Sequence, residues 1–178
     1  MMDKNYRNIL SNGGLIIFPT ETVYGIGCKF DDEEAINKIF KLKNRPASHP
    51  LILHIGSKNL LQKYAADIPN DALVLAEKFW PGPLTLILKK SNIVKEVVTG
   101  GQETVGIRMP NHPVTLNMIN KLGCAIVGPS ANYYSRLSST RISDIPESFK
   151  NAVDLVIDGG YCDLGIESTI IDFSTQNT

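Results

Sequence analysis

Short apolar runs alternate with longer amphipathic segments along most of this chain. Compact apolar runs bounded by glycine, proline or polar residues are typical of buried strands, whereas apolar positions spaced three or four residues apart are typical of helices. The runs predict strands over residues 15–18, 51–55, 84–88, 104–109, 125–127, 155–157 and 169–173. Because predicted helices separate most of these strands, the pattern indicates an α/β fold with a twisted, open and mostly mixed sheet.

The helices are predicted from the same periodicity and from their capping residues. Asp31 or Asp32 caps a helix that ends near Lys43 and has a well-defined apolar face. Further helices are predicted over residues 3–12, 57–65, 70–80 and 112–121, with caps at Ser57, Asn70 and Asn111, and a short helix is predicted after a cap at Ser143. Residues 19–27 and 128–140 are predicted to be loops, and residues 92–102 fit neither pattern.

Composition favours one soluble domain. The chain has 178 residues, of which 43% are hydrophobic, and this is enough for one core and one domain over residues 1–178. The formal net charge is zero, so no overall field attracts nucleic acid. The polar start lacks the apolar core of a signal peptide, and no apolar run approaches the ~20 residues that span a bilayer. The three cysteines form no pair motif, as expected of reduced thiols, so we expect a cytoplasmic protein without membrane contact.

A basic loop is predicted to follow the helix that ends near Lys43. Pro46 and Pro50 disfavour helix there and favour extended backbone at the residues before them. Lys43 offers a compact charge and Arg45 a planar fork of donors, both suited to phosphate or carboxylate groups, on a loop that we expect to be exposed. The alternative is a solvated basic helix end that merely complements the helix dipole.

Several common site motifs are absent from the sequence. It contains no GxxxxGK[ST] loop for phosphates, no GxGxxG after a strand and no GxSxG nucleophile turn. No HExxH or paired-cysteine pattern suggests zinc. His49 and His54 are five residues apart, so on one extended strand they would point to opposite faces, and we predict no metal ion held by protein side chains.

Five short segments that are weak signals alone follow one another in an order that is specific together. They are residues 19–25 (PTETVYG), 43–46 (KNRP), 103–108 (ETVGIR), 130–132 (SAN) and 167–170 (ESTI). With them the sequence resembles the YrdC/Sua5 family of threonylcarbamoyl-AMP synthases from about Gly13 to Asp172. The resemblance implies a single YrdC-like domain in which helices flank the sheet around a concave substrate cavity. The chain is similar to the short single-domain bacterial form, because it ends soon after Asp172.

The resemblance also implies a reaction. L-threonine, bicarbonate and ATP would give threonylcarbamoyl-adenylate and pyrophosphate, and a separate transferase complex would then move the threonylcarbamoyl group to adenosine 37 of tRNAs that read ANN codons. Attack of a carbamate on the α-phosphate of ATP brings an anion towards a polyanion, so positioning and charge neutralisation should dominate catalysis. No protein nucleophile is needed. Mg²⁺ is expected to accompany ATP, because it usually binds substrate phosphates and few protein ligands.

The family pattern assigns roles to individual residues. It implies ATP contacts at Arg45, His49, Thr104, Ser130, Asn132 and Ser138, and it places Lys43 and Arg45 beside the phosphates as the catalytic residues. It implies threonine contacts at Thr22, His54, Arg108, Ser168 and the backbone of Gly128. Arg108 can fork onto the amino-acid carboxylate, and the hydroxyls of Thr22 and Ser168 can select a substrate that carries a hydroxyl.

Simpler interpretations stay open for several of these residues. His54 lies in an apolar strand and could be a satisfied core histidine, and Ser130 and Asn132 could form an ordinary turn. After the SAN segment the family usually runs LSGRPSPT, whereas this chain runs YYSRLSST, so the glycine and both prolines are missing. We therefore expect the loop to take a different path, which bears on the ATP contact of Ser138. The position of His49 varies within the family.

Two other functions compete with the enzyme. The family has also been interpreted as binding double-stranded RNA or tRNA, or as a ribosome maturation factor, and such binding would weaken strongly with salt. The neutral charge of this chain favours small ligands instead. A related domain forms carbamoyl-adenylate in hydrogenase maturation proteins, but the zinc-finger cysteines of those proteins are missing here.

Overall fold

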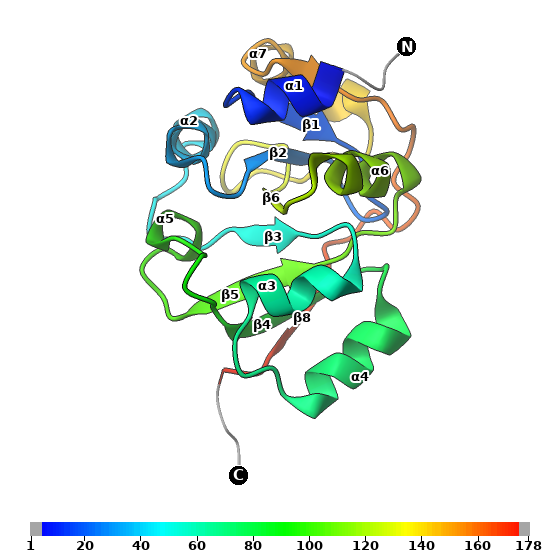
Figure 1. The fold of residues 1–178 in the computed structure, drawn as a ribbon. Helices are drawn as coiled ribbons and strands as arrows, with labels where there is room; N and C mark the ends of the chain where they lie inside the picture. The colour runs from blue at the N-terminus through cyan, green and yellow to red at the C-terminus, as the bar shows by residue number, and fades with distance from the viewer. Residues whose placement is uncertain (1–4, 175–178) are drawn as a thin grey trace.

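An eight-stranded sheet organises the computed structural model, which describes residues 5–174. Its strands are β1 (Ile16–Phe18), β2 (Gly25–Lys29), β3 (Ile52–His54), β4 (Leu84–Lys89), β5 (Thr104–Arg108), β6 (Ile126–Val127), β7 (Leu155–Val156) and β8 (Thr169–Asp172). Their order is β7-β1-β2-β6-β3-β5-β4-β8. The pairs β1–β7, β3–β5 and β4–β8 are parallel and the other pairs are antiparallel. The predicted α/β fold with a mixed, open sheet is confirmed (Figure 1).

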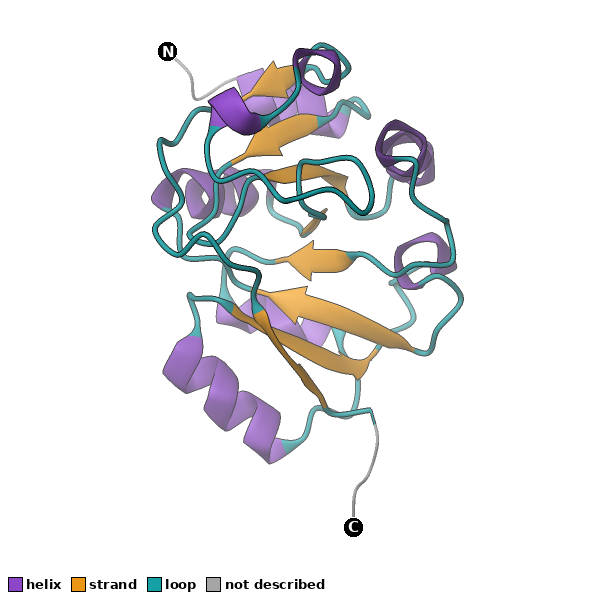
Figure 2. Cartoon of the chain, turned by 180° about the vertical axis from the view of Figure 1, so that it is seen from behind, coloured by secondary structure: helices purple, strands orange, loops and turns teal. Residues whose placement is uncertain are grey.

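Helices and loops lie mainly on different faces of this sheet. The helices are α1 (Asn5–Ser11), α2 (Glu33–Lys43), α3 (Leu61–Tyr64), α4 (Asn70–Phe79), α5 (Glu96–Thr99), α6 (Pro113–Leu122) and α7 (Glu147–Lys150), with 3₁₀ turns η2 (Lys58–Leu60) and η3 (Ile142–Asp144). In Figure 1, α3, α4 and α6 lie in front of the strands. Figure 2, seen from behind, shows long loops crossing the opposite face. Strand side chains on that face can therefore meet loop residues.

The prediction missed strand β2, which it placed in a loop. Glycines alternate with apolar residues at Gly25 and Gly27, and glycine has a low strand propensity, so the segment carries a poor strand signal. The structure explains both glycines. An added Cβ at Gly25 would lie 2.6 Å from the ring of Phe18, and one at Gly27 would lie 2.8 Å from the same ring. The ring of Phe18 thus packs flat over β2, and only glycine leaves room for it.

Helix starts were predicted less well than helix interiors. Asp32 caps α2, and its Oδ1 accepts a hydrogen bond of 2.9 Å from the backbone N–H of Ala35. Ser57 caps η2, which leads into α3. The caps predicted at Asn70, Asn111 and Ser143 are wrong, because the residues that precede those helices are Pro69, His112 and Arg141, none of which makes a side-chain cap. Pro113 instead supplies the fixed φ of a first helical residue. Residues 3 and 4 of the predicted first helix lie outside the described residues.

The end of α2 decides where the basic loop begins. Asn44 adopts the left-handed conformation (φ 52°), and its backbone N–H bonds to the carbonyls of Lys41 and Phe40. The helix therefore ends at Lys43, as the sequence predicts. Lys43 belongs to the buried face of α2, whereas Arg45 follows the left-handed residue and leaves that face. This turn therefore directs the side chains of Lys43 and Arg45 to different sides of the chain.

Candidate functional site

A cavity of about 300 Å³ runs along β3 and is covered by loops. Seven of the residues that the resemblance implies line it, and they are Thr22, Arg45, His54, Gly128, Arg108, Ser130 and Ser168. These residues come from five separate parts of the sequence, so the fold brings together what the sequence only suggested. Lys43, His49, Thr104, Asn132 and Ser138 do not line the cavity.

Arg108 occupies one end of the cavity, where β5 ends. Its Nη2 lies 2.8 Å from Oε1 of Glu21, and both side chains are only 5% exposed. The same Nη2 donates a 2.9 Å hydrogen bond to Oγ1 of Thr22. The other oxygen of Glu21 accepts from the backbone N–H of Asn111 at 2.9 Å. The guanidinium is therefore held in one orientation, while its Nε has no hydrogen-bond partner among the described residues.

Hydroxyl groups near Arg108 are fixed by short local bonds. Oγ1 of Thr20 lies 3.0 Å from Oγ1 of Thr22 and accepts from the backbone N–H of Val23 at 3.2 Å. On the other side, Oγ of Ser168 lies 2.8 Å from Oγ1 of Thr85 in β4. The cavity thus presents two oriented hydroxyls beside a fixed guanidinium. Such a group of donors can bind a carboxylate and a hydroxyl of one small molecule.

His54 lies beside Arg108 and is 3% exposed. Burial, followed by the nearby charge of Arg108, lowers the pKa of His54 to about 3, so the imidazole is neutral at physiological pH. Its ring meets the edge of Phe18 with centroids 5.7 Å apart. Nδ1 is buried and has no hydrogen-bond partner in the described part of the chain. A buried ring nitrogen without a partner, in the wall of a cavity, is suited to a ligand rather than to a satisfied core position.

Gly128 is required by the ring of His54. A Cβ at this position would lie 2.5 Å from Nδ1 of His54 and 3.0 Å from the ring of Phe18. Both rings are packed in the core, so neither can move away cheaply.

For the threonine site that the resemblance implies, we expect Gly128→Ala to displace His54 and to raise the threonine concentration for half-maximal activity about 10-fold, since sub-ångström errors in a site are costly. Gly106→Ala is the control for packing, because its Cβ would meet its nearest atoms at 3.4 Å. Pyrophosphate release against threonine concentration measures the effect, and thermal unfolding monitors the fold. An unchanged threonine dependence for Gly128→Ala would contradict the role given to this close contact.

Arg45 lies at the other end of the cavity, because it bonds to Pro50 before the start of β3, whereas Arg108 lies opposite His54 at the end of β3. Its Nη2 donates a 2.9 Å hydrogen bond to the carbonyl of Pro50, and its Nε is buried without a partner among the described residues. The loop around Arg45 is exposed, as expected, but the arginine side chain itself is half-buried, and burial lowers its pKa. No carboxylate pairs with Arg45 in the part of the chain that the structure describes. Its charge is free to pair with an anion in the cavity.

Lys43 is buried behind the cavity and is 1% exposed. Its Nζ donates to the backbone carbonyls of Ser130 and Asn132, the latter at 2.6 Å, and lies 3.4 Å from Oδ1 of Asn132. A solvated basic helix end is therefore excluded. Burial lowers the pKa of Lys43 to about 8, with a further contribution from Arg45. Lys43 holds the loop that carries Ser130 into the cavity wall.

The remaining implied residues surround the cavity. His49 lies with its Nδ1 3.0 Å from the hydroxyl of Tyr134. Thr104 begins β5, on the same sheet face as Arg108. The amide of Asn132 donates to the carbonyls of Tyr133 and Arg136, which closes the loop on itself.

Ser138 reaches the cavity through Glu167, a lining residue, because the Ser138 hydroxyl donates to Oε1 of Glu167. Ser135, in the loop between Asn132 and Ser138, adopts a left-handed conformation (φ 62°) that glycine adopts most easily. The family pattern has glycine at this position, so the backbone conformation is one that glycine favours although the residue is serine.

The sequence interpretation did not single out several residues of this site. Glu21, Thr20, Thr85 and Glu167 orient or accompany the implied residues. Glu21 and Glu167 lie inside the matched segments PTETVYG and ESTI, which was the available signal. Thr85 carried no signal, since it lies in an apolar strand run and meets Ser168 across a parallel strand pair.

Among the described residues, the site contains neither an ionised thiol nor a cluster of metal-ligating side chains. Cys28, Cys124 and Cys162 are free and buried, and burial raises the pKa of Cys162 to about 11, so this thiol stays protonated at neutral pH. Within residues 5–174, no three His, Cys, Asp or Glu side chains gather closely enough to hold a metal ion. Over the same residues, no helix is long and apolar enough to cross a membrane.

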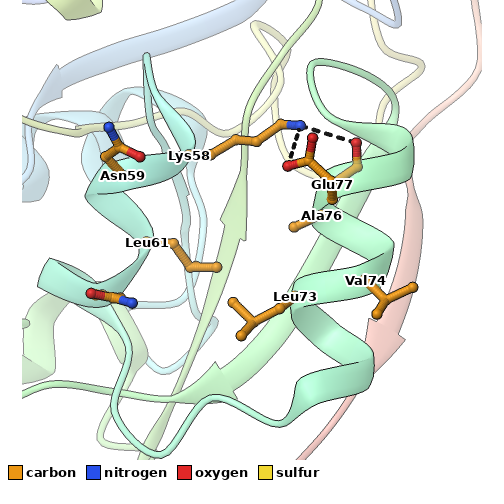
Figure 3. A pocket seen from close by; sticks show the side chains of 8 residues that line it. Lys58, Asn59, Leu61, Leu73, Val74, Ala76 and Glu77 are labelled. Atoms are coloured by element: carbon orange, nitrogen blue, oxygen red, sulfur yellow. Dashed lines mark hydrogen bonds and ion pairs between the residues drawn. The ribbon is translucent and has the colours of Figure 1, made fainter.

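A larger cavity, of about 530 Å³, lies between η2–α3 and α4 (Figure 3). Leu61 and Leu73 point towards each other across it, and Nζ of Lys58 closes one end by pairing with Oε2 of Glu77 at 2.9 Å. None of the implied site residues lines this cavity. Its charged groups, Lys58 and Glu77, are already paired with each other, so size alone does not make it the stronger candidate.

This chain is similar to known proteins over most of its length. The Sua5/YciO/YrdC family model, described as "Telomere recombination", matches residues 8–178. A protein of Pyrococcus abyssi named threonylcarbamoyl-AMP synthase is 46% identical over 165 residues, which cover 93% of this chain and 48% of that protein. One from Bacillus subtilis with the same name is 39% identical over 164 residues, which cover 92% of this chain and 47% of that protein.

A solved structure is also similar to this chain. The crystal structure of P. abyssi Sua5 complexed with L-threonine matches it with a TM-score of 0.93 and 44% sequence identity, and the match covers 96% of this chain and 50% of that chain. The chain thus spans about half the length of these relatives.

Proposed function

Because the chain belongs to the Sua5/YciO/YrdC family, we propose that it makes threonylcarbamoyl-adenylate and pyrophosphate from L-threonine, bicarbonate and ATP. The observation that carries the proposal is one cavity with a guanidinium at each end. Arg108 is already oriented by Glu21 and Thr22, whereas Arg45 has no carboxylate partner among the described residues. The two arginines can therefore hold two anionic substrates in line.

Threonine is assigned to the Arg108 end. The guanidinium would take the amino-acid carboxylate, and the hydroxyls of Thr22 and Ser168 would meet the substrate hydroxyl. The neutral imidazole of His54 would form part of the cavity wall beside the substrate. The solved P. abyssi relative in complex with L-threonine supports this choice of ligand.

ATP is assigned to the Arg45 end and to the surface beyond it. Ligand sites usually measure roughly 300–1,000 Å³, so a cavity of about 300 Å³ holds threonine and the reacting phosphate but not a whole nucleotide. The rest of ATP would extend towards Thr104, Asn132 and Ser138, which lie outside the lining. Arg45 and Ser130 would contact the phosphates, while Lys43 would act on them only by holding the loop of Ser130.

The proposed reaction needs no covalent enzyme intermediate. The threonine nitrogen bonds to the carbon of bicarbonate with loss of water, and a carbamate oxygen then bonds to the α-phosphorus of ATP as the bond to pyrophosphate breaks. Arg108 and Arg45 would bring the two reactants together and offset their negative charges. A separate transferase complex would then consume the adenylate and modify tRNA, and the protein would work in the cytoplasm.

Mg²⁺ is proposed to enter with ATP, and Glu167 fits it. Glu167 is the one carboxylate among the described residues that line the cavity, and it forms no ion pair with their lysines or arginines. Its Oε1 accepts from the Ser138 hydroxyl, so two oxygen ligands lie side by side. Mg²⁺ prefers oxygen ligands and often takes one carboxylate together with substrate phosphates. When bound, the ion would neutralise charge on the phosphates.

We expect Glu167→Gln to raise the Mg²⁺ concentration for half-maximal activity about 10-fold, because a neutral amide is a poor Mg²⁺ ligand. The amide oxygen can still accept from Ser138, so the loop contact is kept. Paramagnetic resonance of Mn²⁺ titrated with protein and ATP gives a readout that does not need turnover. Glu147→Gln is the matched control, since Glu147 is exposed and pairs only with Lys150. An equal Mn²⁺ affinity for both variants would contradict the role of Glu167.

The decisive test of the proposed function is pyrophosphate release from ATP with and without L-threonine and bicarbonate. Release that requires both substrates supports the proposal. Release with neither would indicate simple ATP hydrolysis. No release, together with salt-sensitive tRNA binding, would favour an RNA-binding role instead.

A further inference from the structure

Arg45 belongs to a small cluster of side chains whose other members, Tyr134 and His49, lie outside the cavity lining. The guanidinium carbon of Arg45 lies 5.7 Å from the centre of the Tyr134 ring. The Tyr134 hydroxyl lies 3.0 Å from Nδ1 of His49, and the two rings meet edge to face with centroids 5.3 Å apart. The backbone N–H of Tyr134 also bonds to the carbonyl of Lys43 at 2.8 Å. The cluster thus connects the basic loop to the loop after Asn132.

The cluster restricts the rotamers of the Arg45 side chain. Among the described residues, Arg45 donates one hydrogen bond, from Nη2 to the carbonyl of Pro50, and has no carboxylate partner. Arginine loses much rotamer freedom when it is ordered, so an unrestrained guanidinium is a poor anion site. The ring of Tyr134 restricts it from the side, because a cation is attracted to an aromatic face.

Tyr134 and His49 cannot act on a ligand in the cavity directly. Neither ring lines the cavity, whereas Arg45 does. Tyr134 is also a departure of this chain, because the family pattern LSGRPSPT has serine at the corresponding position. A serine at that position has no aromatic ring, so it could not contact both Arg45 and His49 as Tyr134 does.

We propose that Tyr134 is a positioning residue that holds Arg45 for the phosphates of ATP, and that His49 acts through Tyr134. This inference rests on the proposed function and extends it to residues that do not touch the substrate. His49, which the resemblance implies as an ATP contact, supports the ring of Tyr134 instead. The Arg45 guanidinium, the Tyr134 ring and the His49 imidazole form one chain of contacts that ends at the cavity.

The test compares four variants in direct ATP binding and in pyrophosphate release. Tyr134→Leu removes the ring, Tyr134→Phe keeps the ring but loses the hydroxyl, His49→Ala removes the support, and a double variant combines the last two. Tyr161→Leu is the matched control, because Tyr161 lies over Arg141 at 5.5 Å, outside the cavity lining. Thermal unfolding checks that every variant folds.

We expect Tyr134→Leu to weaken ATP binding about 10-fold, as loss of a partly desolvated cation–π contact implies, without changing the threonine dependence. Tyr134→Phe and His49→Ala should each weaken it about threefold, and the double variant should be no weaker than either, since both break one contact. Unchanged ATP binding in Tyr134→Leu overturns the inference. Additive effects of Tyr134→Phe and His49→Ala overturn the part that makes His49 act through Tyr134.

A second readout separates this inference from the proposed function. The ring resonances of His49 in nuclear magnetic resonance should shift in Tyr134→Phe, with or without ATP, if the hydroxyl contact exists in solution. A wild-type protein that shows the His49 contact but releases no pyrophosphate and binds no ATP would overturn the proposed function, and the positioning role with it. A wild-type protein that is active while Tyr134→Leu matches it would overturn the positioning role alone.

Discussion

Arg108→Ala is expected to abolish efficient use of threonine. Losing one partner of a buried charged contact commonly costs 2–5 kcal/mol, so the threonine concentration for half-maximal pyrophosphate release should rise about 100-fold. ATP binding measured without threonine should not change, since Arg45 lies at the other end of the cavity. Steady-state kinetics in each substrate separately measures both effects.

The same substitution should also destabilise the fold, because it leaves Glu21 behind. Glu21 is 5% exposed and its partner in the ion pair is Arg108, so removing the arginine strands a buried carboxylate. Breaking such a pair typically lowers the free energy of unfolding by about 3–5 kcal/mol. Arg141→Ala is the matched control, because that arginine is exposed and its ion pair with Asp144 should be worth about 1 kcal/mol or less.

A double variant separates the two effects of losing Arg108. Arg108→Gln with Glu21→Gln replaces the ion pair by two neutral amides that can bond to each other, so stability should largely return. Threonine use should not return, because no guanidinium remains for the carboxylate. If the double variant regained normal threonine use, or if the threonine and ATP requirements of Arg108→Ala rose equally, Arg108 would not be the threonine anchor.

The fold was largely predictable because apolar periodicity reflects which side chains are buried. The predicted runs at 15–18, 51–55 and 84–88 became β1, β3 and β4 within about a residue at most boundaries. Strand β2 could not be predicted in the same way, because its glycines are required by the ring of Phe18 rather than by strand propensity. The predicted helix caps failed because α4 and α6 start after Pro69 and His112 without any side-chain cap that a capping pattern could detect.

The sequence predicted which residues form the site, but it did not predict how they contact one another. The resemblance placed Thr22, Arg108 and Ser168 in one site, and the structure brings all three to one cavity. Their individual roles stay predictions, as does the assignment to the short single-domain form, since the relatives described above are about twice as long. The helical spacing places Lys43 on the buried face of α2, but no local pattern identifies its acceptors, which lie 87 and 89 residues further along the chain. Contacts between such distant residues are a property of the fold.

Lys43→Met is expected to weaken ATP binding about 30-fold, although the lysine does not line the cavity. The ammonium holds the carbonyls of Ser130 and Asn132, and each buried acceptor left without a donor costs about 1–3 kcal/mol. The loop should loosen, and Ser130 should leave the cavity wall. Lys41→Met is the matched control, because Lys41 is an exposed residue on the same helix. Equal ATP affinity for the two variants would show that the loop keeps its place without Lys43.

The pH dependence gives Lys43 a signature that no exposed lysine shares. Its pKa is about 8 in the folded protein and 10.5 in an ordinary lysine, with burial as the main cause. Between these values the unfolded chain keeps a proton that the folded chain has lost, so this group makes the free energy of unfolding rise with pH. ATP affinity should change in the opposite direction, falling above about pH 8 as the ammonium that holds the loop is lost. Wild-type protein and Lys41→Met should show both trends, and Lys43→Met should show neither. A constant ATP affinity between pH 7 and 10 in the wild-type protein would mean that the neutral amine holds the loop equally well.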